Sequence, residues 1–267
     1  IFLTGWNEWY AGRFEQFLDY KMPVIFVDTF NQEYSRDIEP MKGGHGDIYY
    51  YQMVSYIRRF KGVRKPPTPS PPKTIRLDGD FRQWDDVGPE FRDAIGDQAQ
   101  RDHPGYNNFT RYANKTGRND FVVMKVARDT ENLYFYARTR DPITPFTDRH
   151  WMLLFIDVDG ERKTGWEGYD FLVNRRVIDT VTTTLEENLG GWNWRKKAMV
   201  RYRVRGNEMM LAIHRADLGL ADSSRPLQID FKWADNMQDE GSMDAFTLNG
   251  DCAPPGRFNY RYAEGAK

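Results

Sequence analysis

Residues 227–233 read Leu-Gln-Ile-Asp-Phe-Lys-Trp, a strict alternation of apolar and polar side chains. Successive side chains of a β-strand point to opposite faces, so this segment predicts a strand with one apolar face against a core. The same period of two recurs at 133–138 and at 200–205. Further strands are expected at 121–127, 151–157, 169–174 and 208–213. Many short strands separated by Gly, Asn and Asp predict a mainly β domain, an antiparallel β-sandwich of jelly-roll-like form.

The charge balance argues against two classes of partner. The chain has 38 Lys and Arg against 39 Asp and Glu, so no basic field attracts nucleic acid or an anionic membrane. No window approaches the ~18 consecutive apolar residues of a transmembrane helix, and no signal peptide is recognisable in this stretch. The single cysteine, Cys252, excludes a disulfide within the chain and a cysteine-based zinc site.

A proline-rich stretch divides the chain. Residues 65–73 contain five prolines, which is incompatible with a helix or an inner strand and is typical of a stiff, extended spacer. The expected organisation is a first segment at 1–62, a linker at 63–73 and a β-sandwich at 74–267. The last of these is large enough to fold alone.

The first segment has the pattern of a closing (β/α) unit. An apolar run at 1–5, a long loop and a helix at 48–60 follow one another, with Asp47 as the predicted N-cap and Gly62 as the helix end. We expect this α/β segment to be the end of a (β/α)8 barrel. Because a whole barrel needs about 250 residues, we also expect the chain to be a fragment of a longer protein.

Glu8 is the first candidate for chemistry. It follows the apolar run directly, and a carboxylate just past a barrel strand lies at the catalytic face. The flanking Trp6 and Trp9 could form a sugar platform and raise the pKa of Glu8 by desolvation. A buried Glu bonded to loop backbone is the alternative. Glycoside hydrolysis needs a second carboxylate roughly 5–10 Å away, for which Glu39 and Glu33 are the candidates.

These motifs resemble a known family. Gly-Trp-Asn-Glu-Trp at 5–9, followed by Ile-Glu-Pro at 38–40, is similar to the final strand and loop of glycoside hydrolase family 99-like barrels. The resemblance covers only the first segment. It implies catalytic roles for Glu8 and Glu39 in an intact barrel, with the missing N-terminal barrel as a partner and no cofactor for catalysis.

The second segment resembles the family 9 carbohydrate-binding modules and their DOMON-like relatives. The similar motifs, in order, are Leu-Asp-Gly-Asp-Phe-Arg-Gln-Trp at 77–84, Asn-Leu-Tyr-Phe-Tyr-Ala at 132–137, Asp-Val-Asp-Gly at 157–160, Gly-Trp-Glu-Gly-Tyr-Asp at 165–170 and Gly-Arg-Phe-Asn-Tyr at 256–260. The resemblance implies a β-sandwich that binds an oligo- or polysaccharide, often with structural Ca²⁺. It also implies a secreted, periplasmic or cell-surface location.

Tryptophans in polar loops are the candidate sugar contacts. Trp166, Trp192 and Trp194 lie in Gly-rich loops, where an indole can stack on a sugar ring or pack into a core. Neighbouring polar groups would bond the hydroxyls, and the candidates are Asn193, Arg257 and Asn259. A pairing of Arg257 with Asp251 in the interior is the alternative for that arginine. Three other tryptophans are expected in the core, namely Trp84, Trp151 and Trp233.

Three aspartates are candidate calcium ligands. Asp157, Asp159 and Asp170 could supply the oxygen atoms that Ca²⁺ prefers. The loop is not an EF-hand, because Arg162 and Gly168 stand at the sixth and twelfth places. Hydrogen bonding within a turn is the alternative role.

Three functions therefore compete. The leading hypothesis is a carbohydrate-binding module that holds a glycoside hydrolase near its glycan. The second is an active glycosidase that uses Glu8. The third is a docking domain without a sugar site, its tryptophans packed on the barrel, and this hypothesis wins if Trp166, Trp192 and Trp194 are all buried.

Overall fold

The computed structural model describes residues 3, 5–6, 12–26, 37–40, 46–97, 101–104, 111–222, 224–248 and 250–265. The chain divides into two compact units, Ile1–Lys65 and Pro66–Lys267. The boundary lies inside the proline-rich stretch, and each unit is described by itself.

The first unit contains a β-hairpin and a helix. Strands β1 (Arg13–Phe17) and β2 (Tyr20–Phe26) pair antiparallel, and α1 spans Ile48–Lys61. The predicted helix is confirmed, and it ends at Gly62, whose φ of 78° lies in the region that favours glycine. Asp47 precedes it as predicted, but the Asp47 side chain makes no capping hydrogen bond.

The expected barrel segment is not confirmed. Of residues 1–5, only Leu3 and Gly5 are described, and neither belongs to a strand. The apolar run at 23–27 largely falls in β2, but β2 pairs with an antiparallel neighbour, whereas the strands of a (β/α)8 barrel are parallel. Helix α1 buries none of its residues. No parallel β/α unit is present among the described residues of the first unit.

The second unit is mainly β. Its chief strands are β6 (Phe121–Arg128), β7 (Asn132–Thr139), β8 (Leu153–Asp157), β9 (Phe171–Val177), β10 (Thr182–Asn188), β11 (Trp194–Arg205), β12 (Glu208–His214) and β13 (Gln228–Asp235). Shorter elements are the 3-10 helices η2 (Phe81–Trp84) and η4 (Arg215–Leu218), α2 (Ala245–Leu248), and strands β3 (Phe91–Arg92), β14 (Asp251–Ala253) and β15 (Tyr260–Ala263). Strands β4 (Arg101–Pro104) and β5 (Arg111–Asn114) form a separate hairpin.

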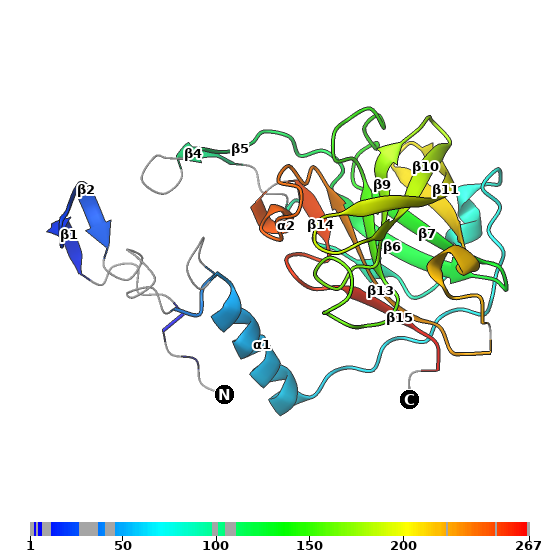
Figure 1. Ribbon diagram of the computed structural model, residues 1–267, viewed down its shortest axis with the longest axis horizontal. Helices are drawn as coiled ribbons and strands as arrows, with labels where there is room; N and C mark the ends of the chain where they lie inside the picture. Colours follow the sequence, from blue (N-terminus) through cyan, green and yellow to red (C-terminus); the bar gives the residue numbers. More distant parts are fainter. Residues whose placement is uncertain are drawn as a thin grey trace. The chain divides into compact units, whose positions relative to one another are not determined.

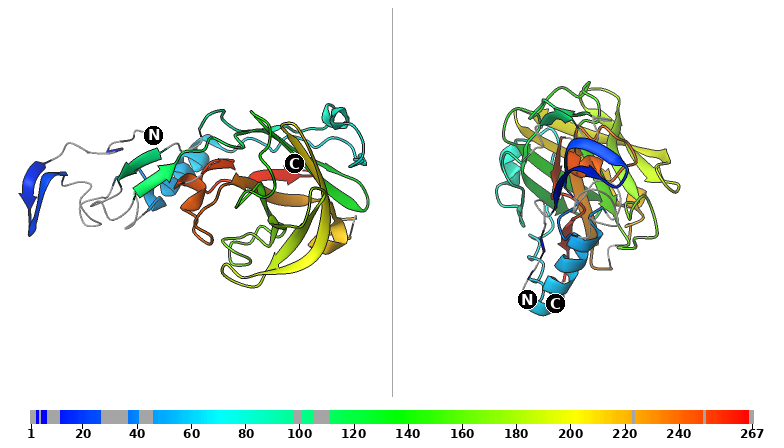
Figure 2. Two further views of the ribbon diagram at one scale, coloured as in Figure 1. Left: turned by 90° about the horizontal axis from the view of Figure 1, so that it is seen from above. Right: turned by 90° about the vertical axis from the view of Figure 1, so that its left-hand side faces the viewer.

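The main sheet is antiparallel throughout its described pairings. Its order is β14-β13-β8-β9-β10-β11-β12-β7-β6-β3, and β15 pairs with the other half of β13. Strands β9, β10 and β11 cross in front of β6, β7 and β13, so that the curved sheet folds back on itself (Figure 1). The view from above shows the same strands wrapping around the interior (Figure 2). The arrangement is sandwich-like and nearly closed, as the alternating sequence predicted.

Both faces of the sheet are buried in places. Along β8, Leu154 and Ile156 point into the central core, whereas Leu153 and Phe155 join a second cluster on the outer face. A third cluster lies over β6, β7 and β12, where η2 inserts Phe81 and Trp84. The sequence predicted a polar outer face, but these two outer clusters are covered by loops and short helices.

A side chain helps to close the sheet. The Asp251 carboxylate, at one end of the strand order, accepts a hydrogen bond from the Phe121 backbone N–H of β6 over 2.6 Å. Edge groups that would otherwise lack a ladder partner are thereby satisfied. Because Asp251 makes this contact and Arg257 is exposed, the interior pairing of Arg257 with Asp251 is wrong.

Part of the proline-rich stretch is attached to the sandwich. The Ser70 N–H bonds to Gly88, the Lys73 N–H bonds to the Arg128 carbonyl, and Arg128 in turn donates to the Ser70 carbonyl. The segment from Ser70 onward therefore does not act as a free spacer.

All seven expected strands are present; their ends agree within a few residues, except that β11 begins at Trp194, six residues before the expected start at 200. The sequence reading missed β10, because its Thr-Thr-Thr-Leu-Glu-Glu-Asn lacks apolar alternation. Trp84, Trp151 and Trp233 are 1%, 2% and 0% exposed, which confirms their placement in the core.

Candidate functional site

A cleft of about 440 Å³ lies beside strands β8 and β9. Four segments build it, namely the loop before β8, the end of β9, the β10–β11 turn and the loop after β13. Its lining residues are Phe146, Thr147, Asp148, Arg149, His150, Trp151, Leu153, Asn174, Arg175, Val177, Trp192 and Glu240. It therefore combines apolar rings with amide, imidazole, guanidinium and carboxylate groups, a composition typical of small-molecule sites.

Three of the seven described non-glycine residues with a positive φ lie in or next to the lining of this cleft. His150, Met152 and Asn174 have φ values of 54°, 45° and 68°, in the left-handed region that few non-glycine residues occupy. The Asn174 side chain donates to the Met152 carbonyl over 2.6 Å and so ties the two strained segments together. Backbone strain of this kind persists only where the surroundings enforce it, and it clusters at functional sites.

Two buried polar atoms at the same place lack partners among the described residues. They are Oδ1 of Asn174, a residue only 3% exposed, and Nε of Arg175. A buried acceptor and a buried donor without partners carry a free-energy cost. Both atoms are closed to solvent, so a ligand hydroxyl would reach either of them only if neighbouring side chains moved.

Trp192 forms the aromatic wall of the cleft. It is half-buried, and it packs edge-on against Trp166 and Trp194 with ring-centroid distances of 4.5 Å and 5.6 Å. Gly241 fits closely behind it, since a Cβ on Gly241 would lie 3.0 Å from Trp192 Cβ. The ring is therefore held from several sides while part of it stays accessible.

A polar network surrounds this ring. Glu240 Oε2 accepts a hydrogen bond from Trp192 Nε1 over 3.0 Å, and Glu240 Oε1 lies 3.4 Å from His150 Nδ1. Arg175 Nη1 donates to the fully buried Glu186 over 3.0 Å. Desolvation lowers the pKa of His150, against the opposing effect of Glu240, so the imidazole is neutral at pH 7.

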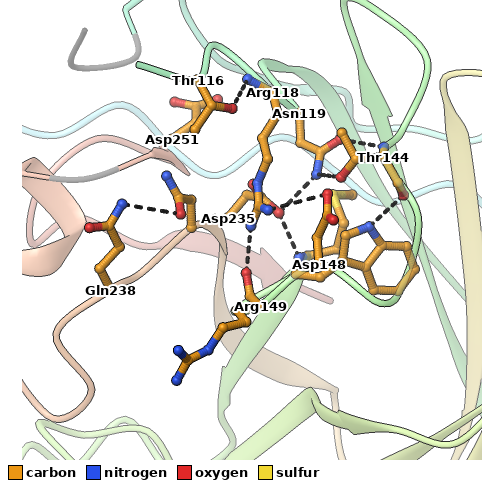
Figure 3. Close-up of polar contacts among 12 residues, drawn as sticks. Thr116, Arg118, Asn119, Thr144, Asp148, Arg149, Asp235, Gln238 and Asp251 are labelled. Atoms are coloured by element: carbon orange, nitrogen blue, oxygen red, sulfur yellow. Dashed lines mark hydrogen bonds and ion pairs between the residues drawn. The ribbon is translucent and has the colours of Figure 1, made fainter. Parts of the chain in front are cut away.

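The loop before β8 is anchored by a buried carboxylate (Figure 3). Asp235 is 0% exposed and accepts hydrogen bonds from Arg118 Nε at 2.7 Å, Asn119 Nδ2 at 2.9 Å and the Met152 N–H at 2.9 Å. Arg118 also donates to the Arg149 carbonyl over 2.6 Å. Desolvation raises the pKa of Asp235, although Arg118 acts against it. This network connects β13 to the lip of the cleft.

The predicted ligand residues divide between cleft and core. Only Trp192 lines the cleft. Trp166 is 4% exposed and belongs to the outer-face cluster, and Trp194 is half-buried beside it. Asn193 is exposed and bonds the Gly190 carbonyl within its own turn.

The two candidates from the closing motif lie outside the cleft. Arg257 and Asn259 are exposed, and Asn259 accepts a hydrogen bond from the Tyr169 hydroxyl over 2.6 Å. The sequence reading missed the polar cleft residues His150, Asn174, Arg175 and Glu240. The only sequence signal was the Asn-Arg-Arg run at 174–176, which contains Asn174 and Arg175 but neither His150 nor Glu240.

The three predicted calcium ligands do come together. One carboxylate oxygen each from Asp157, Asp159 and Asp170 lie within 4.8 Å of one another. Desolvation, with the neighbouring aspartates, raises the pKa of Asp170 to about 6. Their other contacts are the turn hydrogen bonds that the alternative anticipated, including Asp157 Oδ1 with the Gly160 N–H at 2.7 Å. The geometry fits a hard cation, which prefers several carboxylate oxygens.

A second acidic group was not anticipated. Asp93, Asp97 and Asp251 likewise bring carboxylate oxygens within 4.8 Å of one another. Desolvation raises the pKa of Asp93 to about 7 and that of Asp251 to about 8. The buried Lys232 lies near enough to act on both carboxyl groups.

The candidate catalytic groups are only partly described. Glu8 and Glu33 lie outside the described residues, whereas the Glu39 N–H donates to the Trp6 carbonyl over 3.0 Å. The two motifs of the first unit are thus adjacent. A groove of about 690 Å³ runs beside α1, and its described lining residues are Leu3, Ile38, Tyr49, Gln52, Met53, Tyr56, Arg59 and Phe60. This described lining holds no carboxylate.

No helix in the described parts of the chain has the length and apolar character needed to span a bilayer. The sequence matches no known family model, and neither a curated protein nor a solved structure shows significant similarity to it.

Proposed function

We propose that the unit formed by residues 66–267 is a carbohydrate-binding module and that its ligand, an oligo- or polysaccharide, occupies the cleft beside Trp192. The observation that carries the proposal is a half-exposed indole at the edge of a cleft rich in hydrogen-bonding groups. A sugar ring offers C–H faces that lie flat on an indole and hydroxyls that both donate and accept. The resemblance of the sequence motifs to family 9 modules supports the same conclusion.

The proposal extends to the protein as a whole. A binding module attached to a glycoside hydrolase would raise the local concentration of substrate around the enzyme. Catalysis by Glu8 and Glu39 would belong to an intact barrel. Burial of all three loop tryptophans would have favoured a docking domain without a sugar site, and Trp192 and Trp194 are instead partly exposed.

We further propose that Asp157, Asp159 and Asp170 hold a structural Ca²⁺. The convergence of three carboxylates from one loop supports it. The ion would neutralise their mutual repulsion and stiffen the loop that carries Trp166.

Isothermal titration tests the sugar site. In the presence of Ca²⁺, a panel of oligosaccharides is titrated into the wild-type protein and into Trp192→Ala. Losing the stacking platform should weaken binding by at least about tenfold, as expected for a central aromatic contact. Leu189→Ala is the matched control, because Leu189 is exposed and lies close to the same turn.

The two variants separate the possible results. Leu189→Ala should bind as the wild type does, and thermal unfolding should show that both variants are folded. Absence of binding by the wild-type protein to every saccharide would refute the proposal. Equal affinities for the wild type and Trp192→Ala would do the same.

A further inference from the structure

Glu240 makes contacts with three separate walls of the cleft. It belongs to the loop after β13, and its carboxylate accepts from Trp192 Nε1 in the β10–β11 turn at 3.0 Å. The same carboxylate lies 3.4 Å from His150 Nδ1 and 3.7 Å from Arg175 Nη2. Among the described residues, no other lining residue makes polar contacts with as many of the other three segments.

The backbone beside Glu240 also holds the aromatic wall. Gly241 has a φ of 82°, and its missing side chain lets the loop approach the Trp192 ring closely. Trp192 is therefore fixed by a hydrogen bond at its nitrogen and by loop backbone at its Cβ end. Removal of the Glu240 carboxylate would release the first of these restraints.

Glu240 also sets the charge of the cleft. The guanidinium groups and the carboxylates around the cleft and directly behind it are equal in number. The positive groups are Arg118, Arg149, Arg175 and Arg176, and the negative groups are Asp148, Glu186, Asp235 and Glu240. His150 adds no charge at pH 7. Glu186 is fully buried behind the wall, and Asp148 is paired with Arg118 at 3.3 Å. Glu240 and Asp148 are similarly exposed, at 40% and 36%, but only Glu240 contacts the Trp192 ring, so Glu240 is the anion nearest to a ligand stacked there.

We propose that Glu240 is the specificity-determining residue of the cleft: it positions Trp192 as a platform and keeps the cleft electrically neutral, so that uncharged saccharides bind and acidic sugars are rejected. This inference rests on the proposed function. A uronate or sulfated sugar seated on Trp192 would bring its anion close to the Glu240 carboxylate. Like charges a few ångströms apart in a partly buried cleft repel strongly.

Two substitutions separate the roles of the carboxylate. Glu240→Gln keeps an oxygen that can accept from the Trp192 indole but removes the charge, whereas Glu240→Ala removes both. Asp239→Asn is the matched control, because it removes the same charge from an exposed neighbouring position. Each protein is titrated with neutral oligosaccharides and with oligouronates of the same length.

Positioning is also measured without any ligand. The indole N–H resonance of Trp192, assigned by its loss in Trp192→Phe, reports the hydrogen bond to Glu240 directly. It should move in Glu240→Ala and stay close to its wild-type position in Asp239→Asn.

The expected pattern is specific. Glu240→Ala should weaken neutral-saccharide binding by about tenfold, because Trp192 loses the hydrogen bond that holds it as a stacking platform. Glu240→Gln should retain neutral binding within about threefold and should bind oligouronates about tenfold more tightly than the wild type. Asp239→Asn should change neither ligand class.

Failure of this inference is distinguishable from failure of the proposed function. If neutral saccharides bind but Glu240→Gln gains nothing for uronates and Glu240→Ala leaves the indole resonance unmoved, the role of Glu240 is overturned and the sugar site stands. If the wild-type protein prefers uronates, the inference is likewise wrong. If it binds no saccharide at all, both proposals fall.

Discussion

Gly250 illustrates how one residue supports the cleft from behind. It has a φ of 59°, and a Cβ at this position would lie 1.9 Å from the Asp235 carbonyl oxygen. Asp235 in turn holds Arg118 and the Met152 N–H. The close backbone approach therefore allows β13 and the 250 turn to pack beside the network that anchors the cleft lip.

Gly250→Ala should destabilise the protein by about 3 kcal/mol or more, because left-handed strain adds to a clash with backbone that cannot rotate away. Gly206→Ala is the control: its φ of 61° is similar, but nothing lies within 4 Å of the added carbon. It should cost only about 1–2 kcal/mol, the strain alone. Urea unfolding of both variants measures the difference, and equal losses would contradict the steric argument.

At the scale of the element, the loop from Asp157 to Asp170 contains a turn that requires glycine and a group of carboxylates whose ionisation is unfavourable in the folded state. Its turn demands glycine at 165, where a Cβ would lie 2.1 Å from the Tyr169 carbonyl oxygen. The tight turn brings three carboxylates together. Desolvation then raises the pKa values of Asp157 and Asp170, which makes their ionisation unfavourable in the folded state.

This cost has a defined pH dependence in the absence of a cation. The folded protein keeps the Asp170 proton up to about pH 6, whereas the unfolded chain loses it near the ordinary value of 3.8. The folded state binds more protons in that window, so stability should fall as pH rises through it and then level off.

Ca²⁺ should reverse the loss at pH 7. We expect about 5 mM Ca²⁺ to raise the melting temperature by about 3 °C or more, since binding to the folded state alone stabilises it. Asp170→Asn should abolish most of this increase, while Asp179→Asn, which alters an exposed turn elsewhere, should preserve it. Scanning calorimetry with Ca²⁺ and with a chelator measures it. An increase that survives in Asp170→Asn would place the ion elsewhere.

At the scale of the whole molecule, the second unit contains its own buried hydrophobic core. All three buried clusters consist of residues between Ile75 and Tyr262. Its sheet is nearly closed, and the Asp251–Phe121 hydrogen bond joins β14 to β6. By contrast, α1 in the first unit has no buried residue.

Residues 66–267, expressed alone, should therefore fold and unfold cooperatively. The longer form should be compared with one starting at Thr74, which lacks the bonds from Ser70 and Lys73. The shorter form should be less stable by about 1–3 kcal/mol, because it loses the hydrogen bonds that Ser70 makes with Gly88 and Arg128 and that Lys73 makes with Arg128. Chemical unfolding decides this, and equal stabilities would show that the attached segment contributes nothing.

Much of this fold was predictable, because period-two alternation is a local property of the chain. Alternation at three segments and apolar runs at four others located the seven expected strands, and Trp151 and Trp233 lie in the core as predicted, as does Trp84 in its turn. Alternation failed for β10, which is stabilised by its neighbours β9 and β11 rather than by its own pattern. The site was less predictable. Indoles in glycine-rich loops pointed to Trp192, but the same pattern included Trp166, which packing against Phe155 and Phe246 buries.

The sequence by itself determined seven of the strands, the helix that begins at 48, the division near the prolines and the aspartates that could meet an ion, because each depends on residues close together in the chain. Only the tertiary structure decided which tryptophan stays accessible and which polar groups accompany it. Glu240, Arg175 and His150 come from three segments far apart in sequence, and the curvature of the sheet places them around one ring. No local sequence pattern predicts that these three side chains lie close together, because their proximity arises from the packing of distant strands and loops.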